Sequence, residues 1–359
     1  MKPLITYDSN PGFPEIRKAG TAQELREARI SAQNKLLEIK NGAELALWIT
    51  LVNRMHDEVG QRAVWLCERE MNEAGFGQPP ARYAFVAFGS CGRQEATLWS
   101  DQDNGLIIGD EPEGNALMYF RRFGTRLSNM LETAGYPKCK GKVMCSEPAW
   151  NMKISEWERQ LKEWSADHAW EPTRHMIIAS DMRHVAGSRE LSEAWARHFH
   201  SCVLNNTDIL PALLRNTVRH KATLNLMGQI VTERFGEHAG DFDVKYGAYI
   251  PLVNSIRTMA LERGIAETST LRRLERIIML EGGSLLLENA QHAFMLALKM
   301  RNDTPLRFQN GLVGSSDYLP KEQLKNKKVL YELRDTLGVV RRIHRAMLRE
   351  LRMAERKGH

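Results

Sequence analysis

The stretch from Phe85 to Ile108, FVAFGSCGRQEATLWSDQDNGLII, constrains the fold of this chain more than any other. Its first residues belong to Tyr83 to Phe88, a short apolar run rich in aromatic and β-branched residues that follows Pro80. This length and composition predict a buried strand. The run enters Gly89-Ser90, where the near absence of side chains lets backbone N–H groups approach an anion closely.

The residues after this turn favour a phosphate site. Gly92 and Arg93 follow, and Gln94 to Leu98 is predicted to form a short helix whose N-terminus faces the same place. A strand, a Gly-Ser turn and a helix start together predict a phosphate cradle. Its expected binding residues are Gly89, Ser90, Gly92 and Arg93, the last through a bidentate guanidinium contact.

Two aspartates follow the cradle at strand spacing. Asp101 and Asp103 lead into a second apolar strand, Gly105 to Ile108. Residues i and i+2 of a strand point to one face, so the two carboxylates are expected side by side. Adjacent carboxylates repel unless a cation or a proton lies between them. Because Mg²⁺ takes oxygen ligands from one or two carboxylates and from substrate phosphates, the pair predicts a magnesium site.

The combined motif resembles a known superfamily. Gly-Ser, a spacer and Asp-x-Asp entering a strand resemble the nucleotidyltransferases that include DNA polymerase β and kanamycin nucleotidyltransferase. The full form, GSCGRQEATLWSDQDN, is similar to the N-terminal domain of bacterial protein-PII uridylyltransferases. It is more similar still to a bacterial group of predicted nucleotidyltransferases that carry a helical substrate-binding domain behind the catalytic one.

The expected fold class is α+β, with a small mixed-sheet nucleotidyltransferase domain between an N-terminal helical segment and a C-terminal helical bundle. The expected domains are the helical segment at 1–78, the catalytic domain at 79–200 and the substrate-binding domain at 201–359. Residues 1–20 are rich in proline and glycine and predict an irregular arm. Apolar periodicity predicts helices at about 21–40, 43–74, 115–134 and 154–167. Four tryptophans are expected to pack in a core or interface rather than to stack on bases. These are Trp150, Trp157, Trp164 and Trp170.

A third carboxylate is expected from the segment Met176 to Gly187, MIIASDMRHVAG. Its apolar approach and glycine-ended turn predict a third strand of the small sheet. The superfamily places a third carboxylate on such a strand, and glutamine synthetase adenylyltransferases carry a comparable Asp-x-Arg element. The resemblance therefore implies that Asp181 is a third metal ligand or the general base; the alternative is a surface carboxylate at a turn. Arg183 either contacts phosphate or pairs with an aspartate.

The rest of the chain is predicted to be helical throughout, at about 188–202, 208–235, 249–263, 268–280, 286–301 and 321–356. The segment DFDVKYGAYIPLVNSIRTMALERGIAETSTLRRLERI resembles the hallmark of the C-terminal domain in the same bacterial group. Lys245 and Arg257 stand at matching positions. Either they reach the triphosphate, where their charge offsets what develops during transfer, or they form ion pairs within the bundle. We favour the first and count both as nucleotide-binding residues.

Bulk composition places the chain among soluble globular proteins. Its 359 residues allow two or three domains, and 26% charged with 43% hydrophobic residues is ordinary for such proteins. The N-terminus has no apolar segment typical of a secretory signal, and no apolar run approaches the ~20 residues that span a bilayer. Five scattered cysteines without a CxxC pair argue against zinc and a disulfide framework. The expected location is the cytoplasm, without membrane contact. Cys91 is either a reactive thiol or, as we favour, a small filler.

Net charge alone does not choose a partner. A formal charge of +6 suits a nucleoside triphosphate and also suits nucleic acid. The segment from Arg341 to Lys357 is very basic, but such runs are typical of a solvated helix face. Nucleic acid is not favoured, because no RNA- or DNA-binding module is recognisable and aromatic residues are not interleaved with the arginines.

The sequence therefore predicts a metal-dependent nucleotidyltransferase that uses Mg²⁺, with Mn²⁺ as the alternative ion. It would move UMP or AMP from a nucleoside triphosphate to a protein or small-molecule acceptor, and the resemblance extends this to a PII-like signalling protein. The sequence contains no His-Asp metal motif, so it does not support the reverse reaction, removal of the transferred UMP. The alternative is a nucleotide-binding regulatory module without turnover, against which the three aspartates argue. Nucleotide addition to RNA is less favoured.

Overall fold

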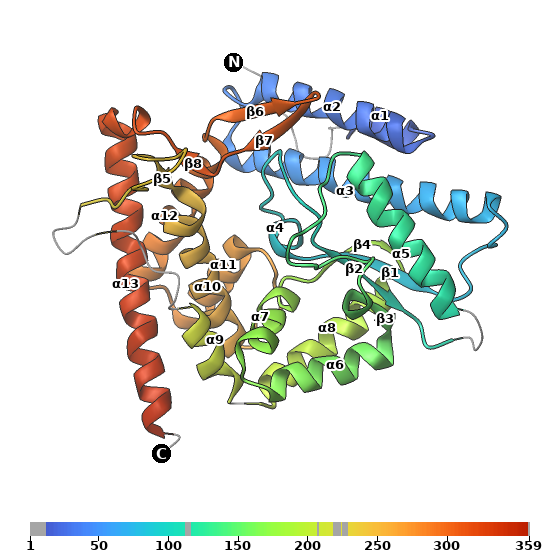
Figure 1. Ribbon diagram of the computed structural model, residues 1–359. Coiled ribbons are helices and arrows are strands. Elements are labelled where there is room, and N and C mark those ends of the chain that lie inside the picture. Colours follow the sequence, from blue (N-terminus) through green and yellow to red (C-terminus); the bar gives the residue numbers. More distant parts are fainter. Residues whose placement is uncertain (1–11, 112–115, 207, 218–223, 225–228, 358–359) are drawn as a thin grey trace. The chain divides into compact units, whose positions relative to one another are not determined.

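The computed structural model describes residues 12–111, 116–206, 208–217, 224 and 229–357 (Figure 1). The chain divides into two compact units. Unit 1 comprises Met1–Ile154, Arg183–Ser192 and Phe308–Val313, and unit 2 comprises Ser155–Met182, Glu193–Arg307 and Gly314–His359. The α+β fold class is confirmed, whereas the predicted domain boundaries stay predictions.

Unit 1 is built around a four-stranded mixed sheet. Its strands are β1 (Tyr83–Ala87), β2 (Asn104–Ile108), β3 (Asn151–Lys153) and β4 (Arg183–Gly187), in the order β3-β2-β1-β4. The central strand β1 is antiparallel to both of its neighbours, and β2 is parallel to β3. Every residue of β1 and β2 is buried, as their uninterrupted apolar runs predict. The first two predicted strands are confirmed.

Helices of unit 1 pack on this sheet or on one another. They are α1 (Pro14–Lys18), α2 (Ala22–Ile39), α3 (Leu45–Glu73), the single turn α4 (Gly89–Gly92) and α5 (Ala116–Thr133), with a 3-10 turn η2 (Pro148–Trp150) before β3. Of these, α3, α4 and α5 contact strands of the sheet, whereas α1 and α2 pack against α3. Thr21 caps α2 by accepting from the Glu24 N–H. The long helix α3 approaches the sheet closely at Gly60, where a Cβ would lie 3.3 Å from Val185 and 3.5 Å from Phe85. The α3 backbone is thus fixed against β1 and β4.

Unit 2 is mostly helical. It contains most of α6 (Ile154–Ala166) and α8 (Arg189–Leu204), and all of α7 (Trp170–Ala179), α9 (Ile209–Thr217), α10 (Ile250–Glu262), α11 (Thr270–Glu281), α12 (Leu285–Asn302) and α13 (Lys327–Lys357). A π-helical turn, η3 (Lys245–Tyr249), precedes α10, and a 3-10 turn, η4 (Gln323–Lys325), precedes α13. Trp157 and Trp195 are fully buried, with ring centroids 5.6 Å apart. Packing roles are confirmed for Trp157 and for Trp150, which contacts Phe88 in unit 1.

Two short β-ribbons interrupt the helices and correct the prediction of a wholly helical C-terminal half. β5 (Phe242–Asp243) pairs with β8 (Tyr318–Leu319), and β6 (Leu306–Gln309) pairs with β7 (Leu312–Ser315). The tip of the second ribbon, Phe308–Val313, groups with unit 1. There Gln33 donates to the Gly311 carbonyl at 3.2 Å and accepts from the Val313 N–H at 3.0 Å.

Three further sequence predictions are wrong in whole or in part, although a third strand of the sheet, β4, does lie within the predicted segment. The strand expected over Met176 to Gly187 begins only at Arg183, because Thr173, Met176 and Ala179 form the buried face of helix α7. A short apolar run fits a helix and a strand equally well by periodicity. The helix expected over Gln94 to Leu98 is absent; the helical turn is α4, and Gln94 has a φ of +59°, which a continuing helix does not accept.

The third is the helix expected over 208–235, which is helical only as far as Thr217. Within that range, residues 218–223 and 225–228 lie outside the described residues, and 229–235 form no helix. In the arm expected over 1–20, the described part contains α1.

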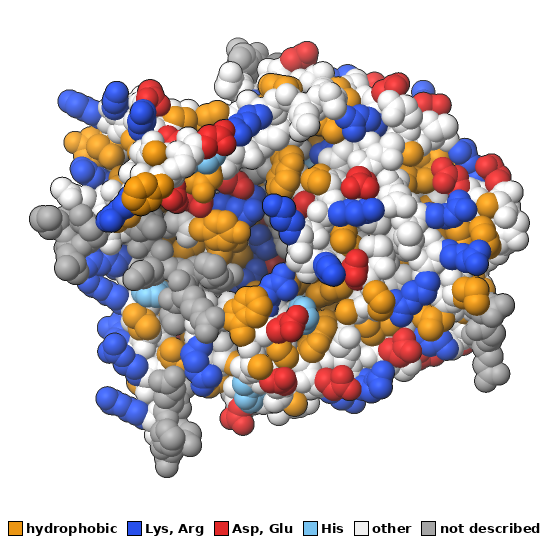
Figure 2. All heavy atoms as spheres, viewed as in Figure 1, with side chains coloured by type: hydrophobic (Ala, Val, Ile, Leu, Met, Phe, Trp, Pro, Cys, Tyr) orange, Lys and Arg blue, Asp and Glu red, His pale blue; other side chains and the backbone are white. Residues whose placement is uncertain are grey.

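Charged side chains are mixed over the surface. Figure 2 shows basic and acidic side chains interspersed over most of the face it views, so no field of one sign covers that face. On α13, an exposed row of arginines is arranged as a solvated face would be: Arg342, Arg345, Arg349, Arg352 and Arg356. In the part of the chain that is described, no helix has the combination of length and apolar character that crossing a bilayer requires.

We expect Gly124→Ala to destabilise the protein. Gly124 lies on α5 where a Cβ would sit 2.6 Å from the Asn151 amide nitrogen and against the Cys145 carbonyl. Overpacking of this kind costs about 1–3 kcal/mol. The matched control is Gly338→Ala on α13, where a Cβ meets nothing within 4 Å and the helix should gain up to about 1 kcal/mol. Urea unfolding of both variants measures the difference; equal midpoints would contradict the packing described.

Candidate active site

The pairing of β1 with β2 brings the Gly-Ser turn to the second aspartate. Ala87 lies opposite Asn104, and the Phe88 N–H donates to the Asp103 carbonyl at 2.9 Å, which extends the pairing by one residue. Gly89 follows with a φ of +55°, and a Cβ there would lie 2.5 Å from Asp103 Oδ2. Glycine is therefore required twice, by its backbone conformation and by the carboxylate beside it.

The turn itself presents backbone N–H groups. The first helical hydrogen bond of α4 runs from the Gly92 N–H to the Phe88 carbonyl at 2.8 Å. The N–H groups of Gly89, Ser90 and Cys91 precede it and so have no acceptor within the helix. Groups of this kind suit a phosphate oxygen. The phosphate-binding role of this turn stays a prediction.

The DQDN motif alternates between aspartates and buried amides. Gln102 and Asn104 are buried: the Gln102 amide donates to the Ser128 and Tyr136 carbonyls at 2.9 and 3.0 Å, and the Asn104 side chain accepts from Cys145 N–H at 2.9 Å. All four residues line one cavity of about 50 Å³, and of these Asp101 and Asp103 bring carboxylates to it. The amides fix the segment, as a role in orienting the carboxylates requires.

A polar stripe on α3 lies along the same cavity. His56, Asp57 and Gly60 line it, and Asn53, one turn earlier, accepts from the Ala96 N–H at 3.0 Å. Their spacing of three and four residues puts them on one helix face. Sequence reasoning missed these residues. The signal that could have found them is a run of polar residues at helical spacing inside the apolar stripe of this helix.

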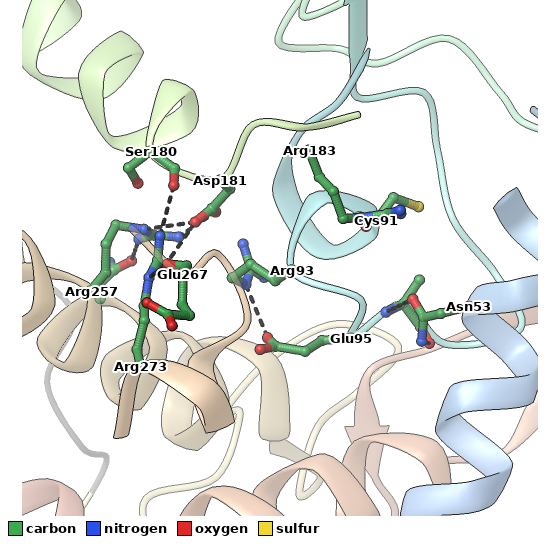
Figure 3. Close-up of polar contacts among 12 residues, drawn as sticks. Asn53, Cys91, Arg93, Glu95, Ser180, Asp181, Arg183, Arg257, Glu267 and Arg273 are labelled. Carbon is green, nitrogen blue, oxygen red and sulfur yellow. Dashed lines mark hydrogen bonds and ion pairs between the residues drawn. The ribbon is translucent and has the colours of Figure 1, made fainter. Parts of the chain in front are cut away.

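Arg183 ties the sheet to α3 and to the Gly-Ser turn, and Figure 3 shows its side chain beside Cys91. From β4, its guanidinium binds the Asp57 carboxylate at 2.6 and 3.0 Å and donates to the Cys91 carbonyl at 2.9 Å. Of the two alternatives for Arg183, the structure shows the pairing with an aspartate. Arg183 thereby positions the turn that faces Asp103.

His56 is a structural group rather than an acid or base. Burial, and then the Arg29 charge, lower the pKa of His56 to about 3. Its Nε2 donates to the Thr97 carbonyl at 2.8 Å, so Nδ1 accepts from the Tyr136 hydroxyl at 2.7 Å. The ring is neutral at physiological pH. Burial likewise raises the pKa of Cys91 to about 11, as expected of a filler rather than a reactive thiolate.

Arg93 forms a buried ion pair with Glu95. Its Nε lies 2.9 Å from Glu95 Oε2, and both side chains are almost fully buried. The contact joins two residues of the loop that follows α4. The phosphate contact of Arg93 stays a prediction.

Asp181 lies in unit 2, in the turn after α7, where it is 1% exposed. Arg257 binds both of its oxygens, at 3.2 and 2.6 Å, and Arg273 binds Oδ1 at 3.1 Å (Figure 3). Arg273 also donates to the Ser180 carbonyl at 2.7 Å. A role as metal ligand stays a prediction, because an oxygen would first have to leave an arginine.

The two basic residues predicted to bind nucleotide are both paired within unit 2. Arg257 binds Asp181, and the Lys245 amine lies 3.6 Å from Asp317, which also binds Arg301 at 2.9 Å. Burial alone would raise the pKa of Asp317, but the charges of Arg301 and Lys245 lower it on balance. The ion-pair alternative is thus the arrangement described; binding to a triphosphate stays a prediction.

Asp101 and Asp103 are the residues that fit a metal ion. Within the described ranges, no group of three or more His, Cys, Asp or Glu side chains is placed to hold one. Two carboxylates at one cavity, next to a turn that presents N–H groups, match the donor set of Mg²⁺ when substrate phosphates supply further oxygens. Mn²⁺ accepts the same oxygen ligands.

We expect Gly89→Ala to weaken Mg²⁺-dependent nucleotide binding at least about tenfold, because the new methyl group displaces the Asp103 carboxylate. The matched control is Gly77→Ala, at a φ of +78° with nothing within 4 Å of a Cβ. Both variants carry a backbone strain of about 1–3 kcal/mol, but only the first disturbs the site. Calorimetric titration of both variants with nucleotide and Mg²⁺ measures the two affinities. Equal affinities would show that Gly89 does not contribute to the nucleotide site.

We expect Asp181→Asn to destabilise the protein by about 3–5 kcal/mol, because it leaves the buried guanidiniums of Arg257 and Arg273 without a carboxylate. Asp335→Asn, at an exposed position on α13, is the control for loss of one negative charge. Chemical unfolding followed by circular dichroism compares them. A stability of Asp181→Asn equal to that of the control would show that the ion pairs contribute nothing.

Comparison with known families covers both parts of the chain. Residues 32–171 match the family described as "Putative nucleotidyltransferase DUF294". Residues 207–351 match that described as "Putative nucleotidyltransferase substrate binding domain". A search among curated proteins returned no match. The chain belongs to the DUF294 nucleotidyltransferase family and carries its substrate-binding domain.

Proposed function

We propose that this nucleotidyltransferase uses Mg²⁺, or Mn²⁺, to move UMP or AMP from a nucleoside triphosphate to a protein or small-molecule acceptor. The observation that carries the proposal is the juxtaposition of Asp101 and Asp103 at one cavity with Gly89 against the Asp103 carboxylate. A phosphate-binding turn and a pair of metal-binding carboxylates are the groups that nucleotidyl transfer requires.

In the proposed reaction, an acceptor hydroxyl oxygen attacks the α-phosphorus of the triphosphate. The bond from that phosphorus to the bridging oxygen breaks, pyrophosphate leaves with the electron pair, and the hydroxyl proton passes to a base or to solvent. A metal ion held by the Asp101 and Asp103 carboxylates would lower the pKa of the hydroxyl and offset charge on the departing pyrophosphate. Asp101 and Asp103 would hold the metal, while the backbone N–H groups of Gly89, Ser90 and Cys91 would hold the outer phosphates. The Gly92 N–H donates to the Phe88 carbonyl, so Gly92 would contribute by the absence of a side chain at the turn.

The remaining predicted site residues would have to exchange partners. Arg93, Lys245 and Arg257 each pair with a carboxylate in the structure. Binding a triphosphate would replace one anionic partner with another, which conserves charge pairing. Asp181 is proposed as third metal ligand or general base, and it can act so only if Arg257 or Arg273 releases one of its oxygens.

For the acceptor, we propose a PII-like signalling protein as the first candidate. The support is the similarity of GSCGRQEATLWSDQDN to the catalytic motif of protein-PII uridylyltransferases. Incubation of the protein with α-labelled UTP or ATP in a lysate of the source cell, followed by gel separation, identifies the acceptor class and the base. Label in a small protein band from UTP supports the candidate, whereas label only in small molecules opposes it.

We expect Asp101→Asn and Asp103→Asn to reduce Mg²⁺-dependent pyrophosphate release to background, because each removes a charged metal ligand. Asp110→Asn, an exposed carboxylate just beyond the other end of β2, is the control and should keep full activity. Circular dichroism verifies that all three variants are folded. Full activity in both site variants would mean that the site is elsewhere.

The alternative function is a regulatory module that binds nucleotide without turnover, and it predicts a different result in binding and pyrophosphate assays. Titration of the unaltered protein with ATP and UTP in Mg²⁺ would give binding, and no pyrophosphate would form with any acceptor tested.

A further inference from the structure

Four helices of unit 2 enclose a second cavity. Helices α10, α11, α12 and α13 contribute its walls, and its volume is about 140 Å³. Its floor consists of buried apolar side chains: Ile256, Leu274, Leu287, Ile343 and Met347. The cavity lies within residues 207–351, which match the substrate-binding domain model.

The polar groups of this cavity come from the ends of α10 and α11, the start of α12, and α13. Arg263 is already bound: its Nε donates to Glu281 at 2.7 Å and its Nη1 to the Met259 carbonyl at 2.8 Å. Ser284 caps α12 by accepting from the Leu287 N–H. These two side chains therefore serve the fold.

Glu350 differs from Arg263 and Ser284 in its hydrogen bonding. It lines the cavity from α13 at intermediate exposure, and among the residues described no side chain forms an ion pair or hydrogen bond with its carboxylate. Burial, and then the nearby charge of Glu262, raise the pKa of Glu350. A partly buried carboxylate beside an apolar floor is unfavourable until a cation or hydrogen-bond donor reaches it.

The charges around Glu350 favour a cation. Three carboxylates act there, Glu262, Glu281 and Glu350 itself, against the guanidiniums of Arg263 and Arg349. Arg263 bonds to both other carboxylates, at 3.0 Å to Glu262 and 2.7 Å to Glu281. Arg349 is exposed to solvent, where its charge is screened. The local balance therefore leaves Glu350 as the negative group that a ligand would neutralise.

The size of the cavity limits the ligand. An apolar cavity of about 150 Å³ accommodates a benzene ring. We infer that the cavity formed by α10 to α13 binds a small organic monocation, with an ammonium group on Glu350 and an apolar body of about benzene size on the floor. The inference does not depend on the proposed transfer reaction, because no residue of unit 1 takes part.

The test uses the full-length protein and three probes of one shape: benzylamine, benzyl alcohol and benzoate. Calorimetric or NMR titration should show benzylamine binding at least about tenfold more tightly than benzyl alcohol, with benzoate weakest. Glu350→Gln should remove the difference between amine and alcohol while benzyl alcohol still binds. Asp335→Asn, on the exposed face of the same helix, should leave the preference unchanged.

A cavity-filling variant keeps the inference falsifiable. Ala346 lines the cavity from α13, and Ala346→Leu should abolish binding of both benzylamine and benzyl alcohol without lowering the unfolding midpoint. Equal affinity for amine and alcohol in the unaltered protein would overturn the assignment of a cation. Benzylamine binding that survives Ala346→Leu, or no binding of benzylamine at about 10 mM, would overturn the site. Normal benzylamine binding by Asp103→Asn separates this inference from the proposed activity.

Discussion

The arrangement in unit 1 depends on a steric constraint: the backbone at Gly89 touches the carboxylate of Asp103. The antiparallel register of β1 and β2 sets this contact, since the pairing continues to Phe88 and Asp103 before the chain turns. A slip of one residue would exchange the face that Asp101 and Asp103 occupy with the face that Gln102 and Asn104 occupy. The buried hydrogen bonds of these two amides oppose such a slip, so the same residues that anchor the loop also fix where the negative charge lies.

Each unit is stabilised internally by ion pairs of arginine, and the two sets of ion pairs differ in their burial. In unit 1, Arg183 joins α3 to the turn through one carboxylate and one carbonyl, both partly exposed to solvent. In unit 2, Arg257 and Arg273 converge on a carboxylate that is 1% exposed. The first network can adjust at modest cost, whereas removing one partner from the second leaves an uncompensated buried charge. An exchange of partners at Asp181 would therefore cost more than one at Asp57.

The sequence predicted the fold class and the two strands that carry the motif, because those signals are local: an uninterrupted apolar run, a glycine turn and alternating side chains. It failed where one local pattern permits two structures. Met176 to Ala179 is apolar enough for either a strand or a helix, and only the burial of Thr173 one turn earlier decides for the helix. The partners of Asp181 could not be read at all, since Arg257 and Arg273 are distant in sequence and arginines at helical spacing usually face solvent. The role of α3 was missed for another reason: its polar residues stand at helical spacing inside an apolar stripe, but spacing alone does not show which loop such a face contacts.

The path of the chain between the units has a consequence for how the protein can be divided. The chain passes from one unit to the other after Ile154, Met182, Ser192, Arg307 and Val313. No single cut therefore releases either unit intact: a fragment ending before residue 183 lacks the edge strand β4, and one ending before residue 308 lacks the β-hairpin tip that binds Gln33. Unit 1 and unit 2 are interleaved along the polypeptide, so recombining either with a different partner domain would require several simultaneous junctions rather than one.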